Sequence, residues 1–278
     1  MAKSYYFYAF IPGKMKISLI IVTYNRPDAL EVILNSILRQ TEILHEVIIA
    51  DDGSDEETSE VIIKYQKSFP CKLKHVWHKD KGFRAAKIRN KAIKKSTGDC
   101  LFFSDGDLFF HPRFFQDLKR NIEPGIALIG SRVFLKKEAT AKMLNNRKPE
   151  NISFFSSKTE RNRLNSLRFS FAAKMMPTVH FSEKLRGGLL CALKKEIVAV
   201  NGWNEDFEGW GKEDTELVAR LWFNDIKLKK LKFAGITYHL WHPHLSRQRI
   251  DKNEKLLLEC IENKSNWCKN GLIKDEKI

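Results

Sequence analysis

The stretch FFSDGDLFF, residues 102–110, places Asp105 and Asp107 on either side of one glycine and between two pairs of phenylalanines. Two carboxylates this close repel each other unless a positive charge relieves the repulsion. Asp-Gly is a common hairpin signal, so one interpretation is a tight turn. The other is a site for a divalent cation, which prefers hard oxygen ligands. The nine residues alone leave both interpretations open.

A second acidic pair lies in FEGWGKEDTELVARL, residues 207–221, where Trp210 stands between two glycines and Glu213 and Asp214 follow. Acidic residues in the first turn of a helix are stabilised by the helix dipole, which accounts for the carboxylates but not for the indole beside them. An indole next to paired carboxylates suits carbohydrate, because the ring packs on a sugar while an acid binds hydroxyls or accepts a proton.

Histidines and basic residues form two more candidate groups. YHLWHPH contains His239, His242 and His244, and one imidazole could complete a cation site begun by the aspartates. An ordinary structural role for these histidines is the alternative. The basic residues of the expected third helix form either a solvated face or a phosphate grip, since guanidinium groups bind phosphate oxygens in pairs. These basic residues are Arg84, Lys87 and Arg89.

The elements that must position these groups alternate between strand and helix. KISLIIVTY, HEVIIADDGS, CKLKHVWHK and DCLFFSDGD predict strands, with helices between them, one beginning near Pro27 and one over about 55–68 with a capping box of Ser54 and Glu57. Such alternation predicts a doubly wound α/β sheet, in which ligands bind outside the carboxyl ends of the strands. TYNRP, ADDGS and SDGD all fall at such ends, which favours a binding site over a simple turn.

The second half is less regular. The segment 136–184 is polar and basic, and within it 161–176 interleaves arginines with apolar residues. An ordinary amphipathic helix and a membrane-surface contact are both consistent with that pattern. LRGGLLCALKKE predicts a strand, KEDTELVARLWFND a helix, KLKFAGITYHLWHPH a strand, and the tail from about 250 a helix.

Composition limits the class of protein. The net charge of +15 indicates an anionic partner, such as a phosphorylated substrate or an anionic membrane surface, and no nucleic-acid-binding motif is present. Five cysteines without a CxxC pair indicate a reducing compartment. Residues 1–14 read as an N-terminal extension without the features of a signal peptide. We therefore expect a cytoplasmic protein, with a peripheral position at the inner face of the membrane as a second expectation.

Taken together, five stretches resemble one known family. SLIIVTYNRPDALEVILNSILRQ, VIIADDGSDEET, GFRAAKIRNKAI, GDCLFFSDGD and GWNEDFEGWGKEDTELVARL are similar to those of GT-A glycosyltransferases of the large inverting family 2, whose GT-A fold is Rossmann-like with a mostly parallel sheet. The last stretch also resembles β-1,4-galactosyltransferases and bacterial chondroitin-polymerase-type enzymes. The resemblance covers about 15–245, whereas residues 1–14 and the basic middle segment fall outside it. We expect a glycosyltransferase domain over 15–245, with a nucleotide-binding half at about 15–135, a basic insertion at about 136–184 and an acceptor half at about 185–245, followed by a helical tail at 246–278.

The resemblance implies roles for individual residues. Asp107 is implied as a ligand of Mn2+ or Mg2+, with His239 or His242 as a further ligand, and Asp105 as a contact of the ribose or of the metal's water shell. Asp214 is implied as the catalytic base and Glu213 as its sugar-binding partner. The nucleotide-binding residues are implied to be Thr23, Tyr24, Arg26 and Asp52, with Arg84, Arg89 and Asp105, while Trp210, Gly188 and Glu213 belong to the acceptor or sugar site.

The implied activity is transfer of a hexose or N-acetylhexosamine from a nucleotide sugar, UDP being expected, to a saccharide or lipid-linked saccharide acceptor, as in bacterial polysaccharide or lipooligosaccharide synthesis. The family's QxxRW motif is absent, which favours single transfers over processive synthesis. Two alternatives belong to other classes. A sugar nucleotidyltransferase would need a glycine-rich phosphate loop near the first strand, where VTYNRP has none. A non-catalytic basic protein would bind nucleic acid or membrane through charge alone.

Overall fold

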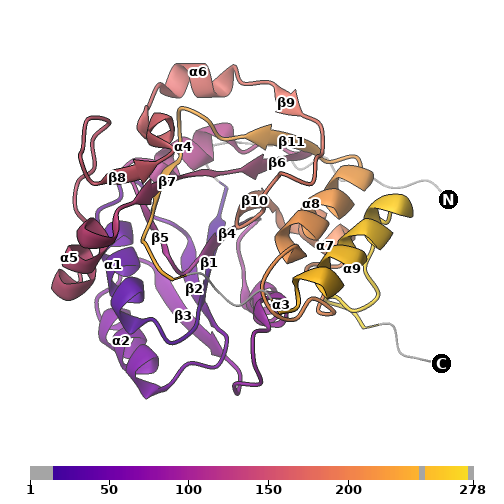
Figure 1. Cartoon of the computed structure of the whole chain (residues 1–278), viewed down its shortest axis with the longest axis horizontal. Helices are drawn as coiled ribbons and strands as arrows, with labels where there is room; N and C mark the ends of the chain where they lie inside the picture. The colour runs from indigo at the N-terminus through magenta and orange to yellow at the C-terminus, as the bar shows by residue number, and fades with distance from the viewer. Residues whose placement is uncertain (1–14, 244–247, 275–278) are drawn as a thin grey trace.

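A large mixed sheet forms the centre of the protein, whose computed structural model describes residues 15–243 and 248–274 (Figure 1). Its strand order is β3-β2-β1-β4-β10-β6-β11-β9. β10 and β9 run antiparallel to their neighbours and the other strands share one direction, so the sheet is mostly parallel, as predicted. In chain order the strands are β1 (Ile17–Thr23), β2 (Glu46–Asp51), β3 (Lys72–Trp77), β4 (Cys100–Asp105), β6 (Ile126–Ile129), β9 (Thr178–Val179), β10 (Leu189–Leu193) and β11 (Lys227–Lys230).

A second, four-stranded sheet has the order β5-β12-β7-β8. Its strands are β5 (Leu108–Phe110), β7 (Ser131–Leu135), β8 (Thr159–Arg161) and β12 (Ile236–His239). The prediction of one strand over KLKFAGITYHLWHPH is wrong, because the chain leaves the large sheet after β11 and enters the small one at β12. Phe233 and Gly235 adopt positive φ angles of 63° and 57° between the two strands, which extended backbone cannot accommodate.

Helices cover both faces of the large sheet, and neighbouring residues of each buried strand face opposite sides. On β4, Phe102 packs into the core with α1 and α4, whereas Phe103 packs into the core with α3, α7 and α8. This two-sided burial explains why the central strands are continuous apolar runs. The helices are α1 (Pro27–Leu38), α2 (Glu56–Gln66), α3 (Ala85–Lys95), α4 (Phe114–Asn121), α5 (Lys137–Asn146), α6 (Ser170–Lys174), α7 (Lys194–Ala199), α8 (Glu213–Phe223) and α9 (Ile250–Glu262).

The segment 161–176 is not the single amphipathic helix considered from the sequence. It consists of the end of β8, a 3-10 turn at Arg163–Ser166 and the short helix α6. Asn162 begins the break with a positive φ of 59°. The Arg163 guanidinium then donates hydrogen bonds to the backbone oxygens of Phe154 and Ser156, each at 2.7 Å, which folds the chain back on the preceding loop.

The predicted capping box of α2 is also wrong. The helix begins after Asp55, which makes no side-chain cap, and the Ser54 hydroxyl instead accepts a hydrogen bond from the Asn25 backbone N–H at 2.9 Å. Ser54 therefore ties the β2–α2 loop to the β1–α1 loop rather than stabilising its own helix. Among the described residues, no helix is long and apolar enough to cross a membrane.

Candidate active site

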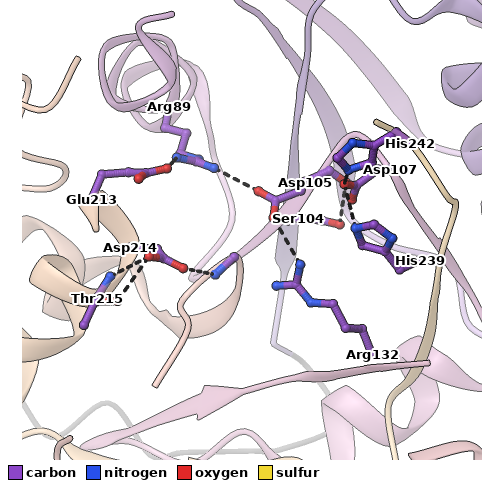
Figure 2. A network of polar contacts seen from close by, with 11 residues as sticks. Arg89, Ser104, Asp105, Asp107, Arg132, Glu213, Asp214, Thr215, His239 and His242 are labelled. Atoms are coloured by element: carbon purple, nitrogen blue, oxygen red, sulfur yellow. Dashed lines mark hydrogen bonds and ion pairs between the residues drawn. The ribbon is translucent and has the colours of Figure 1, made fainter. Parts of the chain in front are cut away.

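One carboxylate and two imidazoles converge where β4, β5 and β12 meet (Figure 2). Asp107 Oδ2 lies 3.1 Å from Nε2 of His239 and 3.0 Å from Nε2 of His242. One potential ligand atom from each residue lies within 4.8 Å of the others, the spacing expected of groups that share one cation. The other carboxylate oxygen, Asp107 Oδ1, is buried and has no hydrogen-bond partner. The structure thus brings together all three residues proposed as metal ligands, while His244 lies outside the described residues.

Strand pairing explains this convergence. β5 and β12 are antiparallel with His239 opposite Leu108, and the Asp107 backbone oxygen accepts a hydrogen bond from Leu240 N–H at 2.9 Å. The turn between β4 and β5 passes so close to β1 that a Cβ on Gly106 would lie 2.3 Å from the Val22 oxygen. The turn suggested by the Asp-Gly pair is thus present at residues 106–107, and Gly106 is needed there for this close approach rather than for a positive φ angle.

The two imidazoles change the acidity of Asp107. Burial alone would raise its pKa, but hydrogen bonds from His239 and His242 hold the pKa far below its ordinary range. The same contact with Asp107 raises the pKa of His242. The carboxylate is therefore ionised at any physiological pH, which a metal ligand must be.

Asp105 lies two residues away but has different partners. Its Oδ1 is 3.0 Å from Nη2 of Arg89, and its Oδ2 is 3.9 Å from Nη1 of Arg132. Burial raises the pKa of Asp105, Arg89 opposes that rise, and Asp107 adds to it. Two guanidinium groups thus supply the positive charge on this side.

Arg89 connects the two acidic pairs of the site. It is only 3% exposed, and besides Asp105 it contacts Glu213, with Nη1 3.4 Å from Oε1 (Figure 2). Its guanidinium carbon lies 4.2 Å from the ring centroid of the fully buried Trp203, a cation–π contact. The sequence suggested phosphate binding for Arg89, whereas in this structure two carboxylates and an indole surround it. Arg132 and Trp203 were not predicted from the sequence, since only the folding of β7 and of the loop before α8 brings them here.

Glu213 and Asp214 form the first turn of α8. Asp214 Oδ1 accepts a hydrogen bond from Thr215 N–H at 2.8 Å, and Oδ2 accepts one from Gly188 N–H at 3.0 Å. A Cβ on Gly188 would lie 2.5 Å from Asp105 Oδ2, so no larger residue fits between the two aspartates. Burial and the charge of Asp214 raise the pKa of Glu213 to about 7. At neutral pH Glu213 is therefore present in both protonation states.

The carboxyl ends of β1, β2 and β3 carry the expected nucleotide-binding residues. Asp52 is buried and accepts hydrogen bonds from His78 Nε2 at 2.6 Å and from Arg84 N–H at 2.7 Å. The Tyr24 hydroxyl donates to Asp80 at 3.0 Å, and the Tyr24 side chain is 47% exposed. The Thr23 hydroxyl is buried without a partner. His78 and Asp80 also join this group, although no local sequence pattern predicted it.

The remaining expected site residues surround this arrangement. Arg26 occupies the N-cap position of α1 without a side-chain cap and contacts Asp28 at 3.3 Å, and the Arg84 guanidinium donates to the Lys79 backbone oxygen. Trp210 is half-buried in the loop before α8, where Gly209 N–H donates to Phe83 O at 3.1 Å. The structure therefore places the expected nucleotide-binding residues and Asp107 near the carboxyl ends of strands of the large sheet, where β12 of the second sheet supplies the histidines and the first turn of α8 supplies Glu213 and Asp214.

The fold and this site define a class, the GT-A transferases, and comparisons with known proteins agree. Staphylococcus aureus TarS superposes with a TM-score of 0.61 at 19% identity, covering 90% of this chain and 40% of that one. GalNAc-T7, solved with UDP, GalNAc and Mn2+, superposes with a TM-score of 0.66 at 16% identity, covering 88% of this chain and 48% of that one. At such identities the likeness establishes the fold alone, and the predicted GT-A fold is confirmed.

The sequence itself places the chain in a family. Residues 18–181 match glycosyl transferase family 2, and residues 168–243 match the N-terminal domain of galactosyltransferase. The first match spans more than half of the chain, so this protein belongs to glycosyl transferase family 2. The family and enzyme class inferred from the five stretches are thereby confirmed.

Curated relatives are longer proteins. Chondroitin synthase of Escherichia coli is 27% identical over 242 residues, which are 80% of this chain and 34% of that protein. Validoxylamine A glucosyltransferase of Streptomyces hygroscopicus is 28% identical over 228 residues, 74% of this chain and 51% of that protein. Hyaluronan synthase of Pasteurella multocida is 28% identical over 229 residues, which are 74% of this chain and 22% of that protein. The chain therefore spans between about a fifth and a half of the length of these relatives.

Proposed function

We propose that this chain is an inverting, metal-dependent glycosyltransferase that moves a hexose or N-acetylhexosamine from a nucleotide sugar to a saccharide hydroxyl. The observation that carries the proposal is Asp107, held by two imidazoles and left with one buried, unpaired oxygen, on the same sheet edge as the Glu213–Asp214 pair. A cation site and a candidate base on one edge are the two parts that such a transfer needs.

The donor atoms of the aspartate–histidine group fit a divalent cation. Two imidazole nitrogens with one carboxylate favour a transition-metal ion such as Mn2+ over Mg2+, which prefers oxygen ligands. When bound, such an ion offsets the negative charge that develops on the leaving diphosphate. Two solved neighbours support this assignment, since GalNAc-T7 is described with Mn2+ and the Pyrobaculum calidifontis mannosyltransferase with GDP-Man and Mn2+.

Asp214 is the proposed general base. Thr215 N–H and Gly188 N–H hold its carboxylate in a fixed orientation, which prepares it to accept the proton of the acceptor hydroxyl. The deprotonated oxygen attacks the anomeric carbon from the face opposite the leaving diphosphate, so one displacement inverts the configuration. No covalent intermediate forms in this scheme. Glu213, with a pKa of about 7, can donate to or accept from a sugar hydroxyl.

The nucleotide is proposed to bind at the carboxyl ends of β1 and β2. The exposed Tyr24 ring offers a stacking surface for the base, and Asp52 is fixed by His78 and Arg84 to accept a base N–H. The unpaired Thr23 hydroxyl lies beside it. UDP is the expected nucleotide because GalNAc-T7 and TarS were both solved with UDP.

The proposed acceptor is a saccharide, free or lipid-linked. Support comes from the names of the relatives, which include synthases of chondroitin and hyaluronan and a glucosyltransferase. A role in bacterial surface polysaccharide or lipooligosaccharide synthesis follows from the same relatives.

A donor screen tests the proposal. Purified protein is incubated with UDP- and GDP-linked sugars, with Mn2+ or with EDTA, and nucleotide release is measured with and without saccharide acceptors. We expect release from at least one donor that requires Mn2+, that an acceptor increases, and that Asp107→Asn abolishes. No release from any donor under either condition would contradict the proposal, and a product with retained anomeric configuration would contradict the inverting scheme.

A further inference from the structure

The short helix α6 buries a small residue and exposes large apolar ones, the opposite of a helix that only covers a core. Its Ala173 is 1% exposed, whereas Phe171 is 82% exposed and Met175, one turn later, is 70% exposed. Phe169, immediately before the helix, is 57% exposed and packs its ring edge against Phe233. Folding gains little from large apolar side chains in water, so a cluster of them marks a surface that binds something.

The charge around this apolar cluster indicates an anionic partner. The sequence contains no acidic residue between Glu160 and Glu183, nor between Asp225 and Asp251, and these two stretches supply α6, β9 and β11. The two stretches meet here, because β9 pairs with β11 and Phe169 N–H donates to Phe233 O at 2.8 Å. Lysines 174, 230 and 232 are exposed on these elements.

Two arginines of this region are not available to bind a partner, because their guanidinium groups are engaged within the protein. Arg168 donates to the buried Asp117 of α4 at 2.9 Å, and Arg163 is used by the backbone oxygens of the preceding loop. Neutralising these arginines would therefore disturb the fold before any binding surface. Because Asp117 is compensated by Arg168, it adds no net negative charge beneath α6.

We propose that a surface made of Phe169, Phe171, Lys174, Met175, Lys230 and Lys232, here called the α6 face, docks on an anionic lipid bilayer. The elements that carry this face lie at the top of Figure 1, where α6 stands beside β9, the edge strand of the large sheet. Exposed aromatic and aliphatic side chains insert at the headgroup boundary, and lysines around them bind lipid phosphates. Single lysines set among apolar side chains fit lipid better than a nucleic-acid backbone, which is tracked by rows of basic groups.

Vesicle flotation tests the inference with the full chain and without any sugar donor, so its outcome is separate from that of the proposed chemistry. We expect binding to vesicles of phosphatidylglycerol mixed with phosphatidylcholine, and little binding to phosphatidylcholine alone. The double variant Phe171→Ser/Met175→Ser should lower the partition coefficient at least about tenfold. Lys174→Glu/Lys232→Glu should lower it by a similar factor and should remove most of the salt dependence.

Matched controls lie on α2, on another part of the surface. Ile63 is 54% exposed and Lys67 is exposed, so Ile63→Ser and Lys67→Glu repeat the same chemical changes there. We expect both controls to bind vesicles like the wild type, and all variants to keep the wild-type melting temperature. Equal loss in the α2 variants, unchanged binding in both α6-face variants, or equal binding to neutral vesicles would overturn the proposal.

Two alternative partners of the α6 face, a second copy of the chain and a nucleic acid, are distinguished by separate measurements. A dimer seen by sedimentation velocity without lipid, and dissociated by Phe171→Ser/Met175→Ser, would show that a second copy covers the face and would overturn the lipid assignment. Displacement from vesicles by a short duplex oligonucleotide, in wild type but not in Lys174→Glu/Lys232→Glu, would overturn it in favour of nucleic acid.

Discussion

Asp105 and Asp107 are separated by one glycine, yet their surroundings are opposite. Asp107 faces two imidazoles and keeps one buried oxygen without a partner, whereas Asp105 faces the guanidinium groups of Arg89 and Arg132. A carboxylate already balanced by permanent cations has little need of an added ion, while one held by titratable imidazoles does. The difference indicates a division of labour, with the cation on the histidine side and the protein's own charges holding the arginine side together.

The largest expected effect is at Asp214, which lies outside the aspartate–histidine group and contacts Gly188 and Thr215. Asp214→Asn should lower kcat by about 10²–10⁴-fold, because the proposed general base is removed while its hydrogen-bonding shape is kept. Affinity for Mn2+, measured by calorimetry, should stay unchanged, since Asp214 lies outside the aspartate–histidine group. Asp225→Asn, at an exposed position after α8, is the matched control and should retain full activity. Weaker Mn2+ binding in Asp214→Asn would break the separation of the two sides.

Arg89 should matter more for stability than Arg132. Arg89→Met leaves the partly buried Asp105 and Glu213 without their shared cation, which should lower the free energy of unfolding by about 3 kcal/mol at pH 8. Arg132→Met removes a contact of 3.9 Å from a side chain that is 23% exposed, and should cost less than about 1 kcal/mol.

The pH dependence of the Arg89 variant follows from its carboxylates. Losing Arg89 raises the folded-state pKa values of Asp105 and Glu213 further, so the destabilisation should be greatest at pH 8 and should shrink towards pH 5 as they become protonated. Urea unfolding at the two pH values measures this difference. Equal losses from Arg89→Met and Arg132→Met at both pH values would contradict the bridging role of Arg89.

Glu213 gives a smaller effect with a defined sign. Its folded-state pKa of about 7 lies above its ordinary value of 4.5, so its stabilising contribution is present below pH 4.5 and is lost as the pH rises through 7. Glu213→Gln should therefore raise the free energy of unfolding at pH 8, by something on the order of 2 kcal/mol, and change it little at pH 4. Glu57→Gln, on the exposed start of α2, is the matched control and should change the free energy of unfolding little. A stabilisation of equal size at both pH values would show that the ionised Glu213 carboxylate does not destabilise the folded protein at pH 8.

The sequence predicted some residues of the site and not others, and the difference has a physical reason. Local patterns are enough to place residues that end strands or begin helices, and this group comprises Asp105, Asp107, His239, Glu213 and Asp214. Arg132 and Trp203 carry no local signal, since they reach the site only through the β7–β12 pairing and through burial beneath Arg89. Local patterns therefore predicted the acids but not the cations that balance them.

The segment 161–176 shows the same limit. Its alternation of basic and apolar residues fits an amphipathic helix, but Arg163 and Arg168 are taken up by loop oxygens and by Asp117 far along the chain. The central strands were predicted well because each is buried on both faces and reads as a continuous apolar run. Sequence patterns report burial reliably and long-range polar pairing poorly.

The central claim is that the cation belongs to Asp107 and its two histidines, and not to Asp105. Calorimetric titration of Mn2+ into the wild type, Asp107→Asn and Asp105→Asn, all without nucleotide, tests it most directly. We predict that Asp107→Asn abolishes measurable binding while Asp105→Asn stays within about tenfold of the wild type. Loss of Mn2+ binding in Asp105→Asn together with its survival in Asp107→Asn would contradict the account.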